Sequence, residues 1–296
     1  MTQLLQGILP ALLTPFRDDE MALDAFRDNI RRYDAFDLAG YVVLGSTGEC
    51  VSLTDDESAL LIKAARETAR PGRKIVAGTA RESTRLTVDF TNRAADLGVD
   101  AALVRPPSYY KAKMTRDALK RHYLDVADRS RVPVILYNIP QNTGITLEAG
   151  LILELARHPN VVGLKESGGN IALVGELVPK LPADFSYVLG AGSAFLPALL
   201  MGASGAILAV ANAAPGVCAR IYALFREGRI REAAALQTAL IPLNKAVMET
   251  YGIAGAKAAI ELQGWYGGPV RGPLAPIDEK GRADLAAILR VLGLLA

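Results

Sequence analysis

Residues 161–167, which read VVGLKES, form an apolar run of the length and composition typical of a buried β-strand. Lys165 stands near the C-terminal end of this run, where a buried and unpaired ammonium would be unfavourable unless the amine had a chemical role. Removal from water favours the neutral form of an amine, and the neutral form attacks carbonyl carbons, so Lys165 is a candidate Schiff-base nucleophile. A lysine at the end of a strand can also extend its ammonium into solvent. What surrounds this strand in the fold therefore decides the role of Lys165.

Apolar runs of this kind recur along the chain, with amphipathic stretches between them. Eight strands are predicted, at residues 7–14, 40–45, 74–79, 101–105, 132–138, 161–165, 186–190 and 205–211. Helices are predicted between them, including residues 23–36, 54–69, 85–97, 115–130 and 147–156. Strands that alternate with helices form a parallel sheet, and eight such units in about 225 residues predict a (β/α)8 TIM barrel. We expect residues 1–228 to form this catalytic barrel and residues 229–296 to form a C-terminal helical extension.

The composition of the 296-residue chain is that of a soluble globular protein, with 51% hydrophobic and 22% charged residues. The net charge is +2, and no run of Lys and Arg could neutralise a phosphate backbone, so nucleic acid is not an expected partner. Cys50 and Cys218 are too few and too distant for a disulfide framework, which favours a cytoplasmic protein, and the N-terminus lacks the basic leader of a signal peptide. Residues 185–219 carry no charge, but glycines and prolines divide them into short pieces, so no membrane span is expected.

Hydroxyl-bearing side chains gather near the predicted C-terminal ends of the strands, where barrel enzymes carry their active sites. Ser46 and Thr47 follow the second strand, Tyr109 and Tyr110 follow the fourth, and Tyr137 lies at the end of the fifth. The turn that contains Ser46 is either a tight connection or a nest of backbone amides that binds an anion. Paired tyrosines are more often packing features than catalytic ones. Tyr137 is harder to assign to packing, because a phenol there can exchange protons with an imine on the next strand.

Several motifs together carry a resemblance to a known family. They are GSTGE at residues 45–49, Tyr109-Tyr110, YNIP at residues 137–140 followed by Thr143-Gly144, GLKE at residues 163–166 and GAI at residues 205–207. With these motifs in this order, the chain resembles, nearly end to end, the dihydrodipicolinate synthase and N-acetylneuraminate lyase family of pyruvate-dependent class I lyases.

This resemblance implies a role for each matching position. Lys165 would form a Schiff base with pyruvate, and Tyr137 would act as acid and base. Ser46 and Thr47 would bind the pyruvate carboxylate. Tyr110 would enter the pocket of a neighbouring subunit in a homodimer or homotetramer, and Thr47 would connect it to Tyr137 in a proton relay. The other positions expected to line the substrate pocket are Asn142, Ser167, Gly190 and Ile207.

One position departs from the pattern of the synthases in this family, which condense pyruvate with aspartate semialdehyde. Those enzymes have an arginine in a Pro-x-Arg-Thr-Gly segment to pair with a carboxylate, whereas this chain has Asn142, a neutral amide without a bidentate fork. Residues 109–114, 165–169 and 265–269 instead resemble 4-hydroxy-2-oxoglutarate aldolases. The predicted reaction is therefore cleavage of 4-hydroxy-2-oxoglutarate to pyruvate and glyoxylate. Dihydrodipicolinate synthase, another 2-oxo acid aldolase of this family and a catalytically inactive ligand-binding paralogue remain as alternatives.

No cofactor is expected beyond the covalent imine on Lys165. The two histidines, His122 and His158, belong to no ligand-like cluster, which argues against a zinc-dependent aldolase. A dicarboxylic substrate would still need a cation at its far end, and each basic residue near the predicted strand ends could equally be a solvated surface charge. The candidates for that cation are Lys111, Lys113 and Arg105.

Overall fold

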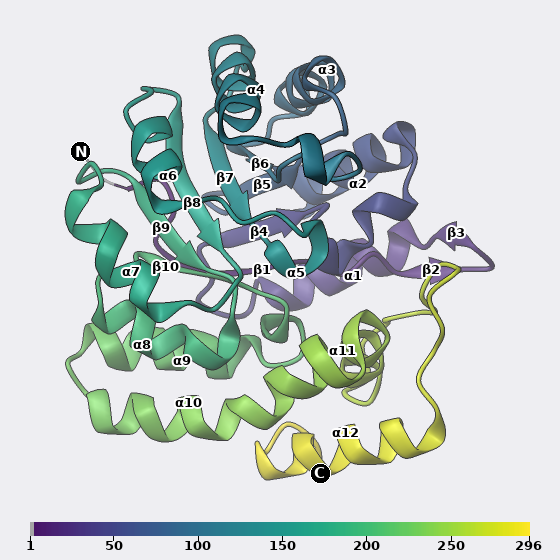
Figure 1. Ribbon diagram of the computed structural model, residues 1–296. Helices are drawn as coiled ribbons and strands as arrows, with labels where there is room; N and C mark the ends of the chain where they lie inside the picture. Colours follow the sequence, from purple (N-terminus) through teal and green to yellow (C-terminus); the bar gives the residue numbers. More distant parts are fainter. Residues whose placement is uncertain (1–2) are drawn as a thin grey trace.

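An eight-stranded parallel barrel forms the centre of the molecule (Figure 1). The computed structural model describes residues 3–296. Neighbouring strands follow the order β1-β10-β9-β8-β7-β6-β5-β4, and a bridge between Ala11 and Val42 joins β1 to β4 and closes the barrel. The strands are β1 (Gly7–Pro10), β4 (Gly40–Val43), β5 (Lys74–Gly78), β6 (Ala101–Val104), β7 (Val134–Asn138), β8 (Val161–Glu166), β9 (Ser186–Leu189) and β10 (Gly205–Leu208). The predicted fold class, a (β/α)8 barrel with a C-terminal helical extension, is confirmed.

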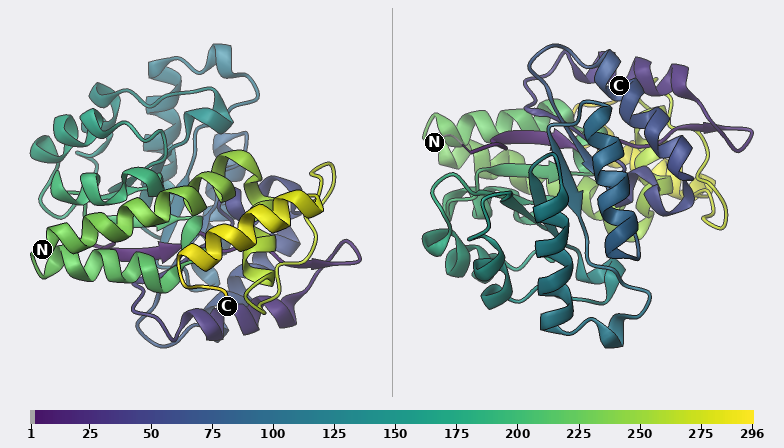
Figure 2. Two further views of the ribbon diagram at one scale, coloured as in Figure 1. Left: turned by 90° about the horizontal axis from the view of Figure 1, so that it is seen from below. Right: turned by 90° about the horizontal axis from the view of Figure 1, so that it is seen from above.

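Helices surround the barrel and continue beyond its last strand (Figures 1 and 2). The helices up to the end of the barrel are α1 (Leu23–Tyr33), α2 (Asp55–Thr68), α3 (Thr84–Asp96), α4 (Arg116–Arg129), α5 (Pro140–Thr143), α6 (Ala149–Leu155), α7 (Ile171–Leu177), α8 (Phe195–Leu200) and α9 (Pro215–Arg226). The extension consists of α10 (Ile230–Lys245), α11 (Gly252–Glu261) and α12 (Glu279–Val291). Since α10 packs along α8 and α9, and α12 packs against α10 and α11, the extension covers one side of the barrel.

Several barrel helices begin at polar residues that cap their first turn. The side chains of Thr54, Ser83 and Thr115 accept hydrogen bonds from the backbone of the first turns of α2, α3 and α4. At α2 the bonding is reciprocal, because Thr54 accepts from the Glu57 backbone at 3.2 Å while Glu57 accepts from the Thr54 backbone at 2.8 Å. These caps fix the points at which the loops after the strands enter their helices.

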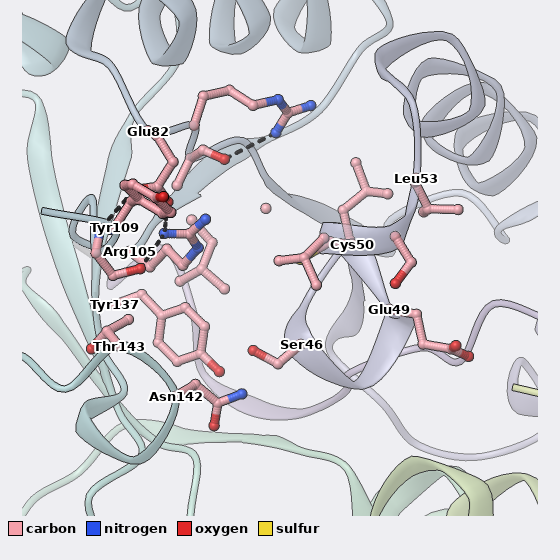
Figure 3. A pocket seen from close by; sticks show the side chains of 18 of the residues that line it. Ser46, Glu49, Cys50, Leu53, Glu82, Arg105, Tyr109, Tyr137, Asn142 and Thr143 are labelled. Carbon is pink, nitrogen blue, oxygen red and sulfur yellow. Dashed lines mark hydrogen bonds and ion pairs between the residues drawn. The ribbon is translucent and has the colours of Figure 1, made fainter. Parts of the chain in front are cut away.

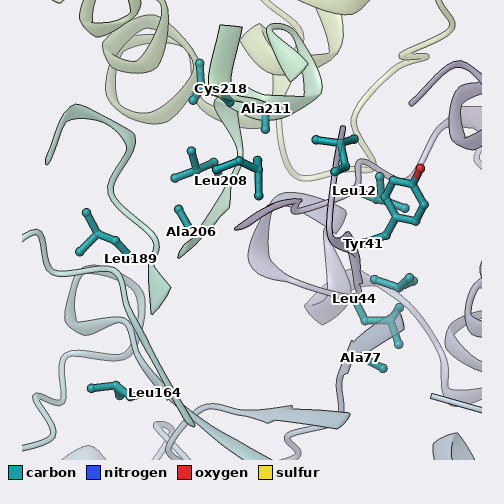
Figure 4. Packing of buried hydrophobic residues seen from close by; sticks show 14 of the residues in the cluster. Leu12, Tyr41, Leu44, Ala77, Leu164, Leu189, Ala206, Leu208, Ala211 and Cys218 are labelled. Carbon is teal, nitrogen blue, oxygen red and sulfur yellow. The ribbon is translucent and has the colours of Figure 1, made fainter. Parts of the chain in front are cut away.

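Alternation along the strands separates residues that fill the barrel from residues that face the helices. Leu164, Leu189 and Leu208 belong to the outer layer, between the sheet and the helices (Figure 4). Because Leu164 faces outward, the adjacent Lys165 faces the barrel interior. The residues that fill the interior include Leu9, Val42, Val76, Leu103, Ile135, Tyr137, Val188 and Ile207.

Besides the ends of some elements, such as the first strand, which stops at Pro10 instead of residue 14, two local features differ from the sequence prediction. The last strand ends at Leu208 instead of residue 211, and Val210–Asn212 forms a 3-10 turn. The buried amide of Asn212 donates to Ala11 O at 2.7 Å and to Ala209 O at 2.9 Å, so side-chain bonds hold the chain here in place of a strand ladder. The other feature is the hairpin of β2 (Phe16–Arg17) and β3 (Glu20–Met21), whose strands are too short to leave a periodic pattern in the sequence.

The uncharged stretch at residues 185–219 is divided into short elements, as expected. It contains β9, α8, β10 and the first turn of α9, which are separated by short turns. No helix within residues 3–296 combines the length and the apolar character needed to cross a membrane.

Candidate active site

Lys165 and Tyr137 lie beside each other on adjacent strands inside the barrel. They are register partners in β8 and β7, so both side chains leave the sheet on the same face. Lys165 is 3% exposed and Tyr137 is 5% exposed. The Lys165 Nζ donates to the Tyr137 hydroxyl at 3.2 Å and lies 4.3 Å from the centroid of the phenol ring. An amine and a phenol thus share a site shielded from bulk water, an arrangement that suits imine chemistry with a neighbouring proton carrier.

A cavity of about 810 Å³ opens at the C-terminal ends of the strands (Figure 3). Its wall combines the loops after β4, β5, β6 and β7 with residues of the C-terminal extension. Three predicted site residues, Ser46, Tyr137 and Asn142, belong to this wall. Figure 3 shows the Tyr137 hydroxyl pointing toward Ser46 and Asn142 at one end of the cavity. The volume is ample for a small oxo acid and an aldehyde.

The turn after β4 is held by a buried ion pair. Ser46–Gly48 forms a 3-10 turn, and Glu49 directly after it has a φ of 55°, in the left-handed region. The Lys257 Nζ lies 2.6 Å from Glu49 Oε1, and these side chains are only 2% and 0% exposed. The backbone N–H of Arg271 donates to the other oxygen of Glu49 at 2.9 Å. Residues of the C-terminal extension therefore support the turn that presents Ser46 to the cavity.

Glu166, which follows Lys165, supports the end of β8. The Asn138 amide donates to one of its carboxylate oxygens at 2.6 Å, and the Gly168 backbone N–H donates to the other at 2.5 Å. Burial raises the pKa of Glu166, and these two hydrogen bonds oppose that shift. The Ser167 backbone N–H also donates to Asn138 O at 2.9 Å. Together these contacts tie the loop after β8 to the end of β7.

Gly190 provides the space that Lys165 and Ser167 occupy. A Cβ atom at this position would overlap Ser167 Oγ and would lie 3.2 Å from Lys165 Cε. Ile207 belongs to the interior cluster that also contains Tyr137. The structure therefore places Gly190 against both Ser167 and Lys165, and it places Ile207 in the same interior cluster as Tyr137.

Among residues 3–296, six predicted site residues are not part of the cavity wall: Lys165, Ser167, Gly190 and Ile207, which lie in and around the barrel interior, and Thr47 and Tyr110. Thr47 is half-buried in the same turn as Ser46, but within residues 3–296 it is not part of the cavity wall. Tyr110 is 71% exposed, and its ring packs edge-on against Tyr109 with 5.0 Å between the centroids. Since Tyr109 borders the cavity, the pair stands at the rim and not beside Lys165. The expected contact of Tyr110 with a neighbouring subunit remains a prediction.

Two arginines, Arg81 and Arg105, lie on the cavity wall. Arg105 is one of the three cations that the sequence offers for a distal carboxylate, and Arg81 is not among them. Arg105 forms an ion pair with Glu82 at 2.9 Å. The other two proposed cations, Lys111 and Lys113, are exposed and lie outside the wall formed by the described residues.

The extension contributes wall residues that sequence reasoning did not identify. Ile253, Pro273 and Leu274 border the cavity although they follow the last barrel strand in the chain. Nothing in the local sequence pattern indicates such a contact, because it depends on how α10 and α11 return across the barrel. In the part of the chain that the structure describes, no group of three or more His, Cys, Asp or Glu side chains could hold a metal ion.

Comparison with known proteins finds relatives over nearly the whole chain. The model of the dihydrodipicolinate synthetase family matches residues 4–292. A 4-hydroxy-tetrahydrodipicolinate synthase from Methanoculleus marisnigri is 37% identical over 288 residues, which cover 96% of this chain and 98% of the relative. The crystal structure of dihydrodipicolinate synthase from Aquifex aeolicus is 30% identical with a TM-score of 0.93, over 98% of this chain and 99% of that one. A monomeric dihydrodipicolinate synthase variant is 28% identical with a TM-score of 0.94, over 98% of each chain. The chain therefore belongs to the dihydrodipicolinate synthetase family.

Proposed function

We propose that this chain is a pyruvate-dependent class I lyase in which Lys165 forms a Schiff base with a 2-oxo acid. Membership of the family makes the chain a lyase, as the sequence predicts, and the proposal adds the residue that forms the covalent bond. The supporting observation is the buried Lys165 amine, 3.2 Å from the hydroxyl of Tyr137, which itself lies on the cavity wall. Ser46 on the cavity wall would hold the carboxylate of the oxo acid.

The proposed reaction uses these residues in sequence. The neutral amine of Lys165 attacks the C2 carbonyl carbon of pyruvate, and loss of water from the carbinolamine leaves a protonated imine. Loss of a C3 proton gives an enamine, whose C3 forms a bond to the carbon of an aldehyde, and the aldehyde oxygen takes a proton from Tyr137. In the cleavage direction, Tyr137 removes the proton of the 4-hydroxyl group as the C3–C4 bond breaks. Hydrolysis of the imine then releases pyruvate and the free amine.

Reductive trapping tests the assignment of Lys165. Treatment with pyruvate and borohydride is expected to add one reduced pyruvate to Lys165, and Lys165→Ala should abolish the addition. Lys257 is a matched internal control, because it is a second buried lysine whose amine is paired with Glu49. Intact-mass measurement and peptide mapping identify the modified residue. An adduct on another lysine, or none, would overturn the proposal.

The second substrate has two candidates. The names of the relatives support the synthase reaction, condensation of pyruvate with aspartate semialdehyde, better than the cleavage of 4-hydroxy-2-oxoglutarate predicted from the sequence. We therefore propose the synthase reaction as the first candidate. Cleavage of 4-hydroxy-2-oxoglutarate is the second candidate, and the observation that favours it is Asn142 on the cavity wall, where the synthase pattern has an arginine.

Steady-state kinetics distinguish the two reactions. Loss of a charge-assisted bidentate contact lowers efficiency by about ten- to a hundredfold. If Asn142 limits the synthase reaction, Asn142→Arg should raise kcat/KM for aspartate semialdehyde by about that factor. A higher kcat/KM for condensation than for cleavage in the unmodified protein supports the first candidate, and the reverse supports the second. Pyruvate trapping without turnover of either substrate would point to another aldehyde or to a ligand-binding paralogue.

A further inference from the structure

We propose that Arg105 binds a carboxylate of the aldehyde partner, so that the enzyme selects aldehydes that carry this group. The inference rests on the proposed Schiff-base function of the cavity and adds the residue that selects the second substrate. Asn142 on the same wall offers only a neutral amide, so the cation for such a carboxylate must come from another position.

One side of the Arg105 guanidinium is engaged in hydrogen bonds and an ion pair, and the N–H groups on its other side are free. Its Nη1 lies 2.9 Å from Glu82 Oε1, donates to Pro106 O at 3.0 Å and lies 3.5 Å from Ser108 Oγ. Within residues 3–296, neither Nε nor Nη2 has a hydrogen-bond partner. One N–H on Nε and two on Nη2 therefore remain available in one plane, which is the fork that binds a carboxylate through two hydrogen bonds.

Glu82 orients this guanidinium without occupying the open side. Its Oε2 accepts the backbone N–H groups of Ser108 at 2.8 Å and Tyr109 at 2.9 Å. Burial would raise the pKa of Glu82, but these hydrogen bonds and the ion pair with Arg105 outweigh burial and lower it. Figure 3 shows the guanidinium on the same wall as Tyr137, directed into the cavity. A carboxylate at the open side would contact Arg105 directly and would lie farther from Glu82, so attraction would exceed repulsion.

The other arginine of the wall has no open side. Arg81 donates from Nε and Nη2 to the same oxygen of Asp55, at 2.9 Å and 2.7 Å, and from Nη1 to Ala80 O at 3.0 Å. Asp55 thus occupies the fork that a substrate carboxylate would need. Among the wall residues that the structure describes, Arg105 is the cation with free donors.

The free donors of Arg105 favour aldehydes that carry a carboxylate. Both candidate reactions use an aldehyde with a carboxylate, and Arg105 can bind that group in either. Neutral sugar aldehydes and aromatic aldehydes would leave the guanidinium fork of Arg105 unpaired inside a partly closed cavity, which disfavours their binding.

Aldol condensation with matched aldehydes tests the inference. The pairs are glyoxylate with glycolaldehyde and succinic semialdehyde with butanal, each an anionic and a neutral aldehyde of equal carbon number. We expect the unmodified enzyme to prefer the anionic member, and Arg105→Met to lower kcat/KM for it by about ten- to a hundredfold while leaving the neutral member unchanged. Arg105→Lys keeps the charge without the fork and should show a smaller loss. Arg81→Met is the control and should leave the ratio between the members unchanged.

Pyruvate trapping on every variant tests the Schiff-base function separately from the role of Arg105, because trapping needs no aldehyde. Failure of trapping in the unmodified enzyme would remove the proposed function and this inference together. Intact trapping with equal losses for anionic and neutral aldehydes in Arg105→Met would overturn this inference alone. If Arg105→Met does not fold, the inference is tested by the preference of the unmodified enzyme and of Arg105→Lys for the anionic aldehyde. Equal kcat/KM values for the two members of each pair would contradict the inference.

Discussion

At the scale of single residues, the proposed chemistry depends on the hydroxyl of Tyr137 beside the Lys165 amine. Tyr137→Phe keeps the buried ring and removes the acid and base, so kcat is expected to fall by about 10²- to 10⁴-fold. Stability should change little, because the ring still fills the same interior position. Steady-state kinetics and urea unfolding of the variant measure both effects. An unchanged kcat would assign proton transfer to another group.

At the scale of secondary-structure elements, α11 supports the loop after β4 through the ion pair between Lys257 and Glu49. Lys257→Met would leave a buried carboxylate without its counter-ion, and breaking one half of such a pair lowers the free energy of unfolding by about 3–5 kcal/mol. Adding Glu49→Gln removes the second charge and should restore part of that loss. Chemical denaturation of the single and double variants measures the coupling. Strictly additive losses would mean that the two charges do not stabilise each other.

His122 gives α4 a predictable dependence on pH. Its Nδ1 lies 2.9 Å from Thr84 Oγ1, and burial lowers the pKa of His122 from 6.5 to about 4, against the opposing charges of Asp125 and Glu82. Between these two pH values the unfolded chain binds a proton that the folded chain does not. The free energy of unfolding should therefore rise with pH across this range, by about 3 kcal/mol in all, and stay level above it.

Urea unfolding at several pH values checks this expectation for His122. The comparison is between the unmodified protein and His122→Gln, which keeps a polar side chain but cannot titrate. The extra rise in stability between pH 4 and 6.5 should be missing from the variant. Parallel curves for the two proteins would show that His122 does not carry the effect.

At the scale of the whole molecule, the family resemblance predicts that Tyr110, which is exposed at the cavity rim, completes a site in a neighbouring subunit. If Tyr110 enters a partner's pocket, Lys165→Ala and Tyr110→Phe proteins should each be nearly inactive, and refolding them together should restore activity. In a symmetric dimer only one site of each mixed pair is complete, so about a quarter of all sites would recover. Pyruvate release by the mixed protein, with each variant refolded alone as control, measures this. Mixed oligomers that stay inactive would mean that Tyr110 acts in its own chain or only packs.

The barrel and the placement of Lys165 and Tyr137 at the ends of its strands could be predicted from the sequence alone. Strand alternation and the order of the motifs are local properties, and they place Lys165 and Tyr137 near the C-terminal ends of neighbouring strands. The same local signals failed at Asn212, where a side-chain amide replaces the strand ladder. They also could not define the hairpin after β1, whose strands are only two residues long.

The residues that complete the cavity could not be predicted without the fold. Arg81 and Arg105 both stand near the end of a predicted strand. In the fold, Asp55 accepts hydrogen bonds from Arg81, whereas Arg105 keeps free donors. In the sequence, Lys257 resembles any exposed lysine of a helix. The packing of α11 brings its amine against Glu49. Hydrogen-bond partners and buried ion pairs depend on distances between segments far apart in the chain, and periodicity along the chain carries no information about those distances.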